Sequence, residues 1–289
     1  MLNVTCEKAF AKVNFGLNVF SKREDNFHSI ESIFQTIDLY DELVVSEIEN
    51  KQCIVECDAF ELPKKNTLTL SYEAFCSVSD VDVPGVKVNL KKGIPSGGGL
   101  GGGSADAAAL VRVLQKMCGI KLSDEKLDLI ASKTGSDVFF FQHCDDEGKG
   151  CALVSGRGEV VKKIIPRDDL FLLLIFPKVS SSTKEAYDLV DKYLAKKDKV
   201  KGPGLAELED IYRKAVNQWN FVNTFTPALS KKYKEIEAAL IDLKKVGSEY
   251  VEMSGSGSTV FGVSTLEQQA INSYNLLAEF WNCKVARVV

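Results

Sequence analysis

A glycine-rich segment between a predicted strand and a predicted helix constrains this chain more than any other feature. Six of the eleven residues 95–105 are glycine; residues 86–91 alternate as in a strand, and residues 107–114 are strong helix formers. Glycine adopts positive φ and lets a ligand approach bare amides, while a helix start adds unpaired N–H groups and a positive dipole end. The order strand, loop, helix therefore predicts a phosphate-binding site, with Ser104 as a helix N-cap whose hydroxyl could instead face a phosphate or a metal ion.

Other interpretations of this loop fit less well. A flexible linker is rarely placed between a good strand and a good helix, and no lysine lies inside the loop as the Gly-x-x-x-x-Gly-Lys-Ser/Thr pattern requires. Gly97-x-Gly99-x-x-Gly102 formally satisfies the dinucleotide-binding pattern, with Asp124 about 20 residues further on. However, Asp124 follows Ser123 at the start of another predicted helix, where an acid serves the helix dipole. Phosphate binding is therefore the prediction, and dinucleotide binding remains a weak alternative.

Composition excludes several classes of protein. The chain has 289 residues, 45% of them hydrophobic, and a net charge of −4 with both signs mixed, so we expect a globular protein of two domains without a nucleic-acid surface. The basic run 196–201 indicates a solvated helix end and loop. No secretory or membrane-length apolar segment is apparent, so we expect no membrane partner and a cytoplasmic location. The oligomeric state is not indicated.

Cysteine and histidine usage limits the metal chemistry. The eight cysteines form no Cys-x-x-Cys pair, and Cys53 and Cys57 lie on one face of a predicted strand, so we expect buried, reduced thiols. His28 and His143 are the only histidines, which excludes a histidine-rich site. We expect His143 to be structural, and any metal to be a hard cation held by oxygen, hence Mg²⁺.

Polar residues in the first half are candidates for a site. Residues 8–20 alternate as a strand with one polar face, which places Lys12 and Asn14 side by side; the pattern alone favours solvent exposure for both. Asp137 follows a Gly135 turn and precedes the apolar run 138–141, which reads as a strand. Its position fits a catalytic acid and an Asx-turn residue equally well.

The second half follows a different pattern. A predicted boundary near residue 165 separates residues 1–165 from residues 166–289. Apart from extra helices, the second segment reads β-α-β-β-α-β, a ferredoxin-like unit. Its predicted strands cover 170–176, 250–253, 259–263 and 284–288, and its predicted helices cover 182–195, 205–219, 227–247 and 266–280.

Three motifs in the right order resemble those of the GHMP small-molecule kinases. Residues 95–105 match the family's phosphate loop, residues 11–14 match its N-terminal motif, and residues 254–258 match its C-terminal glycine-rich motif. The resemblance implies an α+β fold of two lobes: an N-terminal, ribosomal-S5-like lobe that binds ATP and a C-terminal ferredoxin-like lobe. It also implies that ATP and substrate bind in the cleft between the lobes.

Further segments resemble one branch of that family. These are residues 27–35, 66–68, 97–103 and 135–138. That branch transfers the γ-phosphate of ATP to a tertiary hydroxyl of a cytidine-diphosphate-linked sugar alcohol in the non-mevalonate pathway to isoprenoid precursors. A small-molecule substrate with a cytidyl group, ATP and Mg²⁺ are therefore the expected ligands.

The resemblance implies roles for single residues. Asp137 matches the catalytic acid, Lys12 its partner, and Asn14 a polar residue on the substrate side. His28 matches the group that reads the cytosine edge, and Tyr187 matches an aromatic residue that encloses the base, with Thr183 and Phe27 nearby. Asn66 is the expected adenine contact and Ser104 the expected Mg²⁺ ligand. The implied ATP-binding loop is Pro95, Ser96, Gly97, Gly98, Gly99, Leu100, Gly101, Gly102, Gly103, Ser104 and Ala105.

Two departures and two alternatives accompany the resemblance. Phe27 stands where tyrosine is usual, and since stacking on a pyrimidine needs only the ring, we expect binding to survive. Phe139 stands where proline is usual, which affects the expected backbone there.

Another kinase of the family, acting on mevalonate, phosphomevalonate or homoserine, stays open, as does a non-catalytic sensor on the same fold. The Phe27-His28 segment and Tyr187 argue against the first, and Lys12 with Asp137 against the second.

Overall fold

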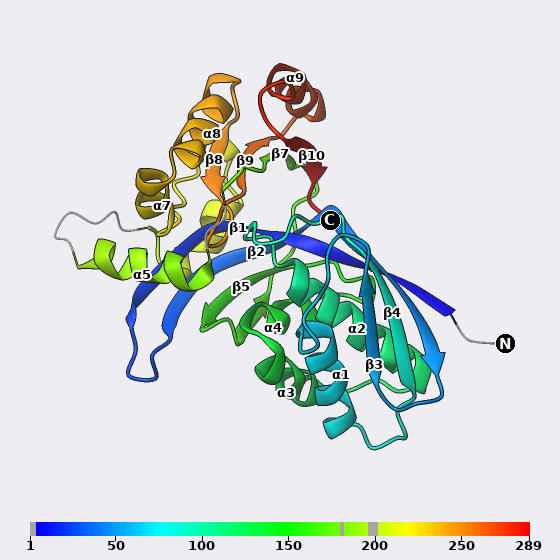
Figure 1. Ribbon diagram of the computed structural model, residues 1–289. Helices are drawn as coiled ribbons and strands as arrows, with labels where there is room; N and C mark the ends of the chain where they lie inside the picture. The colour runs from blue at the N-terminus through cyan, green and yellow to red at the C-terminus, as the bar shows by residue number, and fades with distance from the viewer. Residues whose placement is uncertain (1–3, 180–181, 196–201) are drawn as a thin grey trace. The chain divides into compact units, whose positions relative to one another are not determined.

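The computed structural model describes residues 4–179, 182–195 and 202–289, so the basic run 196–201 lies outside the described residues. The chain forms two compact units (Figure 1). The first unit consists of Met1–Ala11, Leu39–Ser96 and Gly101–Gly150, and the second of Lys12–Asp38, Gly97–Leu100 and Cys151–Val289. The long strands β1 (Val4–Lys22) and β2 (His28–Ile48) pair with each other, and each unit contains part of both. The expected domain division near residue 165 stays a prediction.

The first unit places helices beside a small sheet. The end of β2 pairs antiparallel with β4 (Gly85–Lys91), and β3 (Cys53–Cys57) pairs parallel with β4. Four helices gather beside β3 and β4 and pack on one another (Figure 1). They are α1 (Thr67–Val78), α2 (Gly102–Cys118), α3 (Asp124–Thr134) and α4 (Ser136–Gln142).

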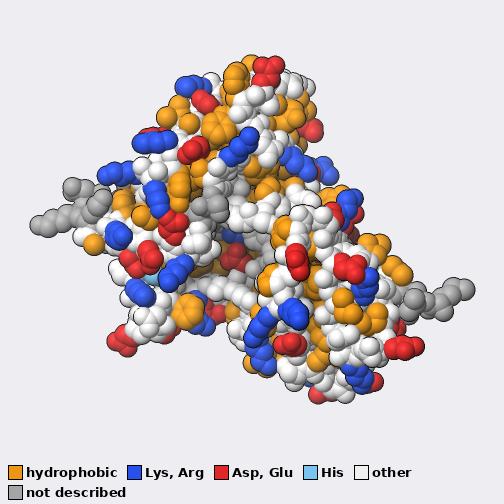
Figure 2. Space-filling view, viewed as in Figure 1, with side chains coloured by type: hydrophobic (Ala, Val, Ile, Leu, Met, Phe, Trp, Pro, Cys, Tyr) orange, Lys and Arg blue, Asp and Glu red, His pale blue; other side chains and the backbone are white. Residues whose placement is uncertain are grey.

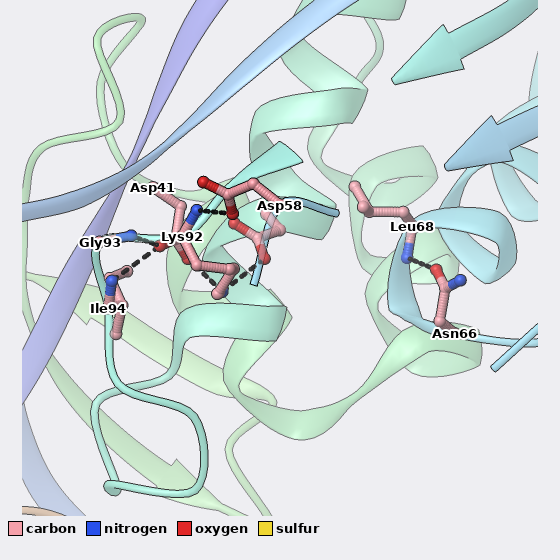
Figure 3. Close-up of polar contacts among 8 residues, drawn as sticks. Asp41, Asp58, Asn66, Leu68, Lys92, Gly93 and Ile94 are labelled. Atoms are coloured by element: carbon pink, nitrogen blue, oxygen red, sulfur yellow. Dashed lines mark hydrogen bonds and ion pairs between the residues drawn. The ribbon is translucent and has the colours of Figure 1, made fainter. Parts of the chain in front are cut away.

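Local sequence explains where these helices begin and end. The Asn66 side chain caps α1 by accepting from the amide of Leu68 (3.0 Å, Figure 3) and from the amide of Thr69 (3.1 Å). Gly119 ends α2 in the left-handed conformation, with φ 65°. Asp124 lies in the first turn of α3, as the dipole argument expects.

The strand expected after Asp137 is wrong, because residues 136–142 form helix α4. Val138, Phe139, Phe140 and Phe141 are all buried in this helix. A short apolar run buried on all sides has no periodicity that separates strand from helix. Phe139, where proline is usual in the family, continues the helix.

The second unit contains the expected ferredoxin-like sheet. Its four strands are ordered β10-β7-β9-β8 and every neighbouring pair is antiparallel. These strands are β7 (Phe171–Ile175), β8 (Tyr250–Met253), β9 (Val260–Ser264) and β10 (Cys283–Arg287). Residues 30–35 of β2 also pair with β5 (Cys151–Gly156), which pairs with β6 (Val160–Lys163). No pattern in the sequence analysis marks β5 or β6.

Helices of the second unit are shorter than expected in two places. They are α5 (Thr183–Leu194), α6 (Leu205–Tyr212), the 3₁₀ turn η1 (Val216–Gln218), α7 (Thr226–Lys232), α8 (Lys234–Lys245) and α9 (Glu267–Leu277). The helix predicted for 205–219 ends at Tyr212, and the helix predicted for 227–247 breaks at Tyr233, whose backbone is extended. α8 packs on β8 and β9, and α9 packs on β7 and β10 (Figure 1).

The charged surface agrees with the composition, whereas the burial of the cysteines does not. Lysine, arginine and acidic side chains are interspersed on the face in view in Figure 2. Across the described part of the chain, no helix is long and apolar enough to cross a membrane. All eight cysteines are free, but only Cys151 is buried, and Cys6 and Cys76 are exposed, so the expectation of buried thiols is wrong for most of them.

Candidate active site

The glycine loop has the positive φ angles that its composition predicts. Gly97, Gly99 and Gly101 have φ of 72°, 74° and 73°, a conformation that favours glycine. Gly101 is the N-cap of α2, which corrects the expectation that Ser104 caps this helix. The left-handed Gly101 turns the chain into the helix earlier than a side-chain cap at Ser104 would. Ser104 therefore lies in the first turn, and its hydroxyl makes no capping bond.

The C-terminal glycine motif supports the middle of this loop within the second unit. The Thr259 amide donates to the Gly98 carbonyl (3.2 Å), and the Ser254 hydroxyl donates to the Gly99 carbonyl (3.0 Å). The packing is tight, since a Cβ on Gly99 would lie 2.1 Å from the Ser254 carbonyl oxygen. Two motifs about 155 residues apart in sequence thus form one structure.

Gly99→Ala is expected to destabilise the chain far more than Gly97→Ala. Both glycines have positive φ, which costs alanine about 1–2 kcal/mol. A Cβ on Gly97 meets no atom within 4 Å, whereas one on Gly99 overlaps the Ser254 backbone, which adds about 1–3 kcal/mol. Urea unfolding of both variants would measure the difference, and equal losses would contradict the tight support described for Gly99.

Lys12 and Asn14 are buried, contrary to the solvent exposure that their pattern favoured. Only 3% of Lys12 and 1% of Asn14 are exposed, because β1 is covered on both faces there. Lys12 Nζ donates to Asn14 Oδ1 (2.8 Å) and to the Gly99 carbonyl (3.2 Å). Asn14 Nδ2 in turn donates to Ser32 Oγ (3.1 Å). The ammonium of Lys12 is thus held at the backbone of the glycine loop.

The residues expected around a base partly meet in the second unit. The rings of His28 and Tyr187 stack with centroids 4.7 Å apart, and His28 Nε2 lies 2.8 Å from Asp191 Oδ1. Thr183, which is exposed, lies one helical turn before Tyr187 on α5. Phe27 is 51% exposed, and the Arg157 guanidinium lies over its ring at 4.5 Å. Sequence reasoning missed Asp191, although its i+4 spacing from Tyr187 places both on one helix face.

Asp137 and Ser104 belong to the first unit. Asp137 is half-buried in the first turn of α4. α4 packs on α2, and a Cβ on Gly135 would lie 4.0 Å from Ser104 Oγ, so the starts of the two helices are neighbours. Lys12 lies in the other unit, and its pairing with Asp137 stays a prediction.

Geometry bears on the expected role of Asn66 and on the expected metal ion. The Asn66 amide is engaged locally, since Nδ2 donates to the Pro63 carbonyl (2.9 Å) while Oδ1 caps α1. Its contact with adenine therefore stays a prediction. Within residues 4–179, 182–195 and 202–289, no group of three or more His, Cys, Asp or Glu side chains could hold a metal ion. A bound Mg²⁺ and the role of Ser104 Oγ in holding it stay predictions.

Two polar networks escaped sequence reasoning. In the second unit, Asn223 Nδ2 donates to the carbonyls of Met253 and Gly255 (both 2.8 Å), and Glu252 accepts from the Asn223 amide (3.1 Å). Burial raises the pKa of Glu252, although the hydroxyl of Thr226 and two amides that donate to it oppose the rise. This network holds the strand that leads into the C-terminal glycine motif.

In the first unit, Asp41 and Asp106 flank Lys92. Lys92 Nζ donates to Asp41 Oδ2 (Figure 3) and to Asp106 Oδ2 (3.1 Å), and all three side chains are nearly or fully buried. Burial disfavours the ammonium, but the two carboxylates outweigh it and raise the pKa of Lys92. Burial, followed by the charge of Asp41, raises the pKa of Asp106 to about 8. No isolated sequence signal marks this cluster.

Asp106→Asn is expected to flatten the pH dependence of stability. Because the pKa of Asp106 is raised on folding, the folded state binds more protons than the unfolded state between about pH 4 and pH 8. The stabilisation that Asp106 contributes is therefore present at low pH. As the pH rises towards 8, its contribution to the free energy of unfolding falls by at most about 1.4 kcal/mol per pH unit. Urea unfolding of both proteins from acid to neutral pH would show the difference shrinking with pH, and parallel curves would contradict the raised pKa.

Comparison with known proteins agrees with this fold. The family model "GHMP kinases N terminal domain" matches residues 66–145, and "GHMP kinases C terminal" matches residues 205–282. The chain belongs to the GHMP kinase family.

Similar proteins include 4-diphosphocytidyl-2-C-methyl-D-erythritol kinase of Treponema pallidum (strain Nichols), with 37% identity over 97% of both chains. The enzyme of the same name from Thermotoga maritima is 38% identical over 90% of this chain and 92% of its own. A crystal structure of 4-(cytidine 5'-diphospho)-2C-methyl-D-erythritol kinase matches with a TM-score of 0.78 and 26% identity, covering 98% of this chain and 99% of the other. Mevalonate kinase of L. major shares the fold, with a TM-score of 0.70 and 15% identity over 99% and 96% of the two chains.

Proposed function

We propose that this chain is an ATP-dependent kinase that phosphorylates the 2-hydroxyl of 4-diphosphocytidyl-2-C-methyl-D-erythritol in the non-mevalonate pathway. The observation that carries the proposal is the buried ammonium of Lys12, which donates to the Gly99 carbonyl inside the glycine loop. The relatives that are 37–38% identical to this chain have the name of this enzyme, and each match covers at least 90% of both chains. The stacked rings of His28 and Tyr187 support a substrate with a base.

The glycine loop is proposed to hold the phosphates of ATP. The amides that begin α2 lie at the positive end of the helix dipole, which favours an anion there. Bound Mg²⁺ would neutralise phosphate charge, and Ser104 Oγ is the protein oxygen proposed to hold it. Asn66 is proposed to line the adenine end.

Asp137 and Lys12 are the proposed catalytic pair. The acceptor oxygen attacks the γ-phosphorus, the bond from that phosphorus to the β–γ bridging oxygen breaks, and ADP leaves. Asp137 takes the proton of the acceptor hydroxyl. The ammonium of Lys12 stabilises negative charge on the transferred phosphoryl group. Asn14 orients Lys12, to which it is hydrogen-bonded at 2.8 Å.

The cytidyl group is proposed to bind beside His28 and Tyr187. Asp191 at 2.8 Å orients the imidazole of His28, so that its other ring nitrogen can read the cytosine edge. The rings of Tyr187 and Phe27 offer apolar faces for the base, a contact worth about 1–3 kcal/mol. Thr183 lies on the same side of α5 as Tyr187 and is a further proposed contact.

We also propose the domain division near residue 165. The two family models fall on either side of it, at residues 66–145 and 205–282. Residues 1–165 would form the ATP-binding domain and residues 166–289 the ferredoxin-like domain. A cytoplasmic location is proposed because the reaction consumes ATP.

The experiment that tests the function is ADP release from Mg-ATP with 4-diphosphocytidyl-2-C-methyl-D-erythritol, run beside mevalonate and homoserine. Turnover with the cytidyl substrate alone, and inhibition by CMP, is the expected result. Turnover with another acceptor would support a kinase but contradict the proposed roles of His28 and Tyr187 in binding a base. ATP binding without turnover on any acceptor would instead indicate a sensor.

A further inference from the structure

We propose that Asp41 is a positioning residue that, with Lys92, fixes the two ends of the glycine loop and thereby sets the affinity for ATP. The inference rests on the proposed function in one respect, that the loop binds the phosphates of ATP. Neither residue belongs to the matched motifs, and no role in the reaction follows for them from the resemblance. All groups in the cluster lie in the first unit.

The entrance of the loop is held by carboxylates. Asp41 Oδ1 accepts from two successive amides, those of Gly93 (2.7 Å) and Ile94 (2.8 Å), as Figure 3 shows. The preceding amide, that of Lys92, donates to Asp58 Oδ1 (3.0 Å). Three consecutive amides immediately before Pro95 are thus bound by side chains. Asp41 itself is fully buried on β2, which gives these bonds a rigid support.

The exit of the loop is connected to the same carboxylate through Lys92. Lys92 Nζ bridges Asp41 on β2 and Asp106 on α2. Contact with the helix start is close, since a Cβ on Gly102 would lie 3.2 Å from Ile94 Cγ2 and 3.4 Å from Lys92 Nζ. The residues on either side of the segment 95–101 therefore contact the same buried cluster of charged side chains. A change at Asp41 would move both ends and so the amides that face the phosphates.

A contribution to folding stability does not by itself explain why the side chains of this cluster are charged. Replacing a buried ion pair by apolar side chains is often neutral or stabilising, so such a cluster is weak support for a purely structural role. Here two buried carboxyl side chains contact a single ammonium, Asp41 beside the entrance of one loop and Asp106 beside its exit. Asp41, Lys92 and Asp106, with the exposed Asp58 at the rim, are the charged groups that the contacts bring together.

Asp41→Ala, Asp41→Asn and Lys92→Met test the proposal, with Glu7→Gln as matched control. Glu7 forms a nearly buried ion pair with Arg112 and a bridge to Lys116, both on α2 and in the same unit, away from the loop. Asp41→Ala is expected to raise KM for ATP about tenfold or more, as the loss of buried hydrogen bonds implies. KM for the acceptor should stay within about twofold. Asp41→Asn should be milder because its Oδ1 still accepts from both amides.

Amide hydrogen exchange of the ligand-free chain gives a readout that needs no activity. Asp41→Ala, or Asp41→Asn and Lys92→Met if alanine prevents folding, should speed exchange over residues 92–106, and Glu7→Gln should not. Unchanged exchange in that segment, or an equal rise of both KM values in the Asp41 and Glu7 variants, would overturn the proposal. Failure of the wild-type chain to bind or use ATP would reject the proposed function, whereas the exchange result would still decide whether Asp41 holds the loop.

Discussion

Asp137→Asn is expected to lower kcat by about three orders of magnitude. Asparagine keeps the size of the side chain but cannot take the proton of the acceptor hydroxyl. The half-buried position of Asp137 in the first turn of α4 tolerates the amide, so folding should be retained. Steady-state turnover with saturating ATP and acceptor is the measurement.

Asp124→Asn provides the matched control for this variant. Asp124 also lies in the first turn of a helix of the same unit, and its substitution removes the same charge. Losing that helix-dipole interaction costs about 0.3–1 kcal/mol of stability and should leave turnover unchanged. Near wild-type turnover in Asp137→Asn would reject the catalytic assignment. Equal losses in both variants would attribute the effect to the fold.

Lys12→Met is expected to lower kcat/KM by about two to three orders of magnitude. Methionine replaces much of the aliphatic stem but removes the ammonium that donates to Asn14 and Gly99. The positive charge proposed to stabilise the transferred phosphoryl group is lost with it. Arginine should not restore activity, because a planar guanidinium cannot replace a compact ammonium in this buried position.

Lys8→Met separates this effect from a general loss of charge on β1. Lys8 lies on the same strand, is exposed, and its ammonium sits over the ring of Tyr40 at 4.2 Å. Activity of Lys8→Met should resemble that of the wild type. If Lys12→Met lost no more activity than Lys8→Met, Lys12 would have no catalytic role.

Local features of the fold follow from the sequence. Asn66 caps α1, Gly119 ends α2, and the last segment forms the expected ferredoxin-like sheet. These outcomes depend on backbone preferences and capping bonds within a few residues, which local sequence specifies. Residues 138–141 of α4 read as a strand because their burial on all sides removes the periodic signal.

The position of the site's side chains follows from tertiary structure. Lys12 and Asn14 read as solvent-facing along β1, yet residues distant in sequence bury them. His28 meets Asp191, 163 residues away, and Asp41 meets Lys92 and Asp106 across three elements. Such pairings depend on which elements pack together, and no local spacing encodes them.

The sequence by itself thus predicted a phosphate-binding loop, and it determined the family and the order of most helices and strands. It did so because glycine conformation, helix capping and strand alternation are local properties. Only the tertiary structure decided that Ser254 and Thr259 support Gly98 and Gly99, and that Asp41 holds the entrance of the loop. Burial and long-range hydrogen bonds arise when distant segments pack, and in this chain they decide which polar residues can act on a phosphate.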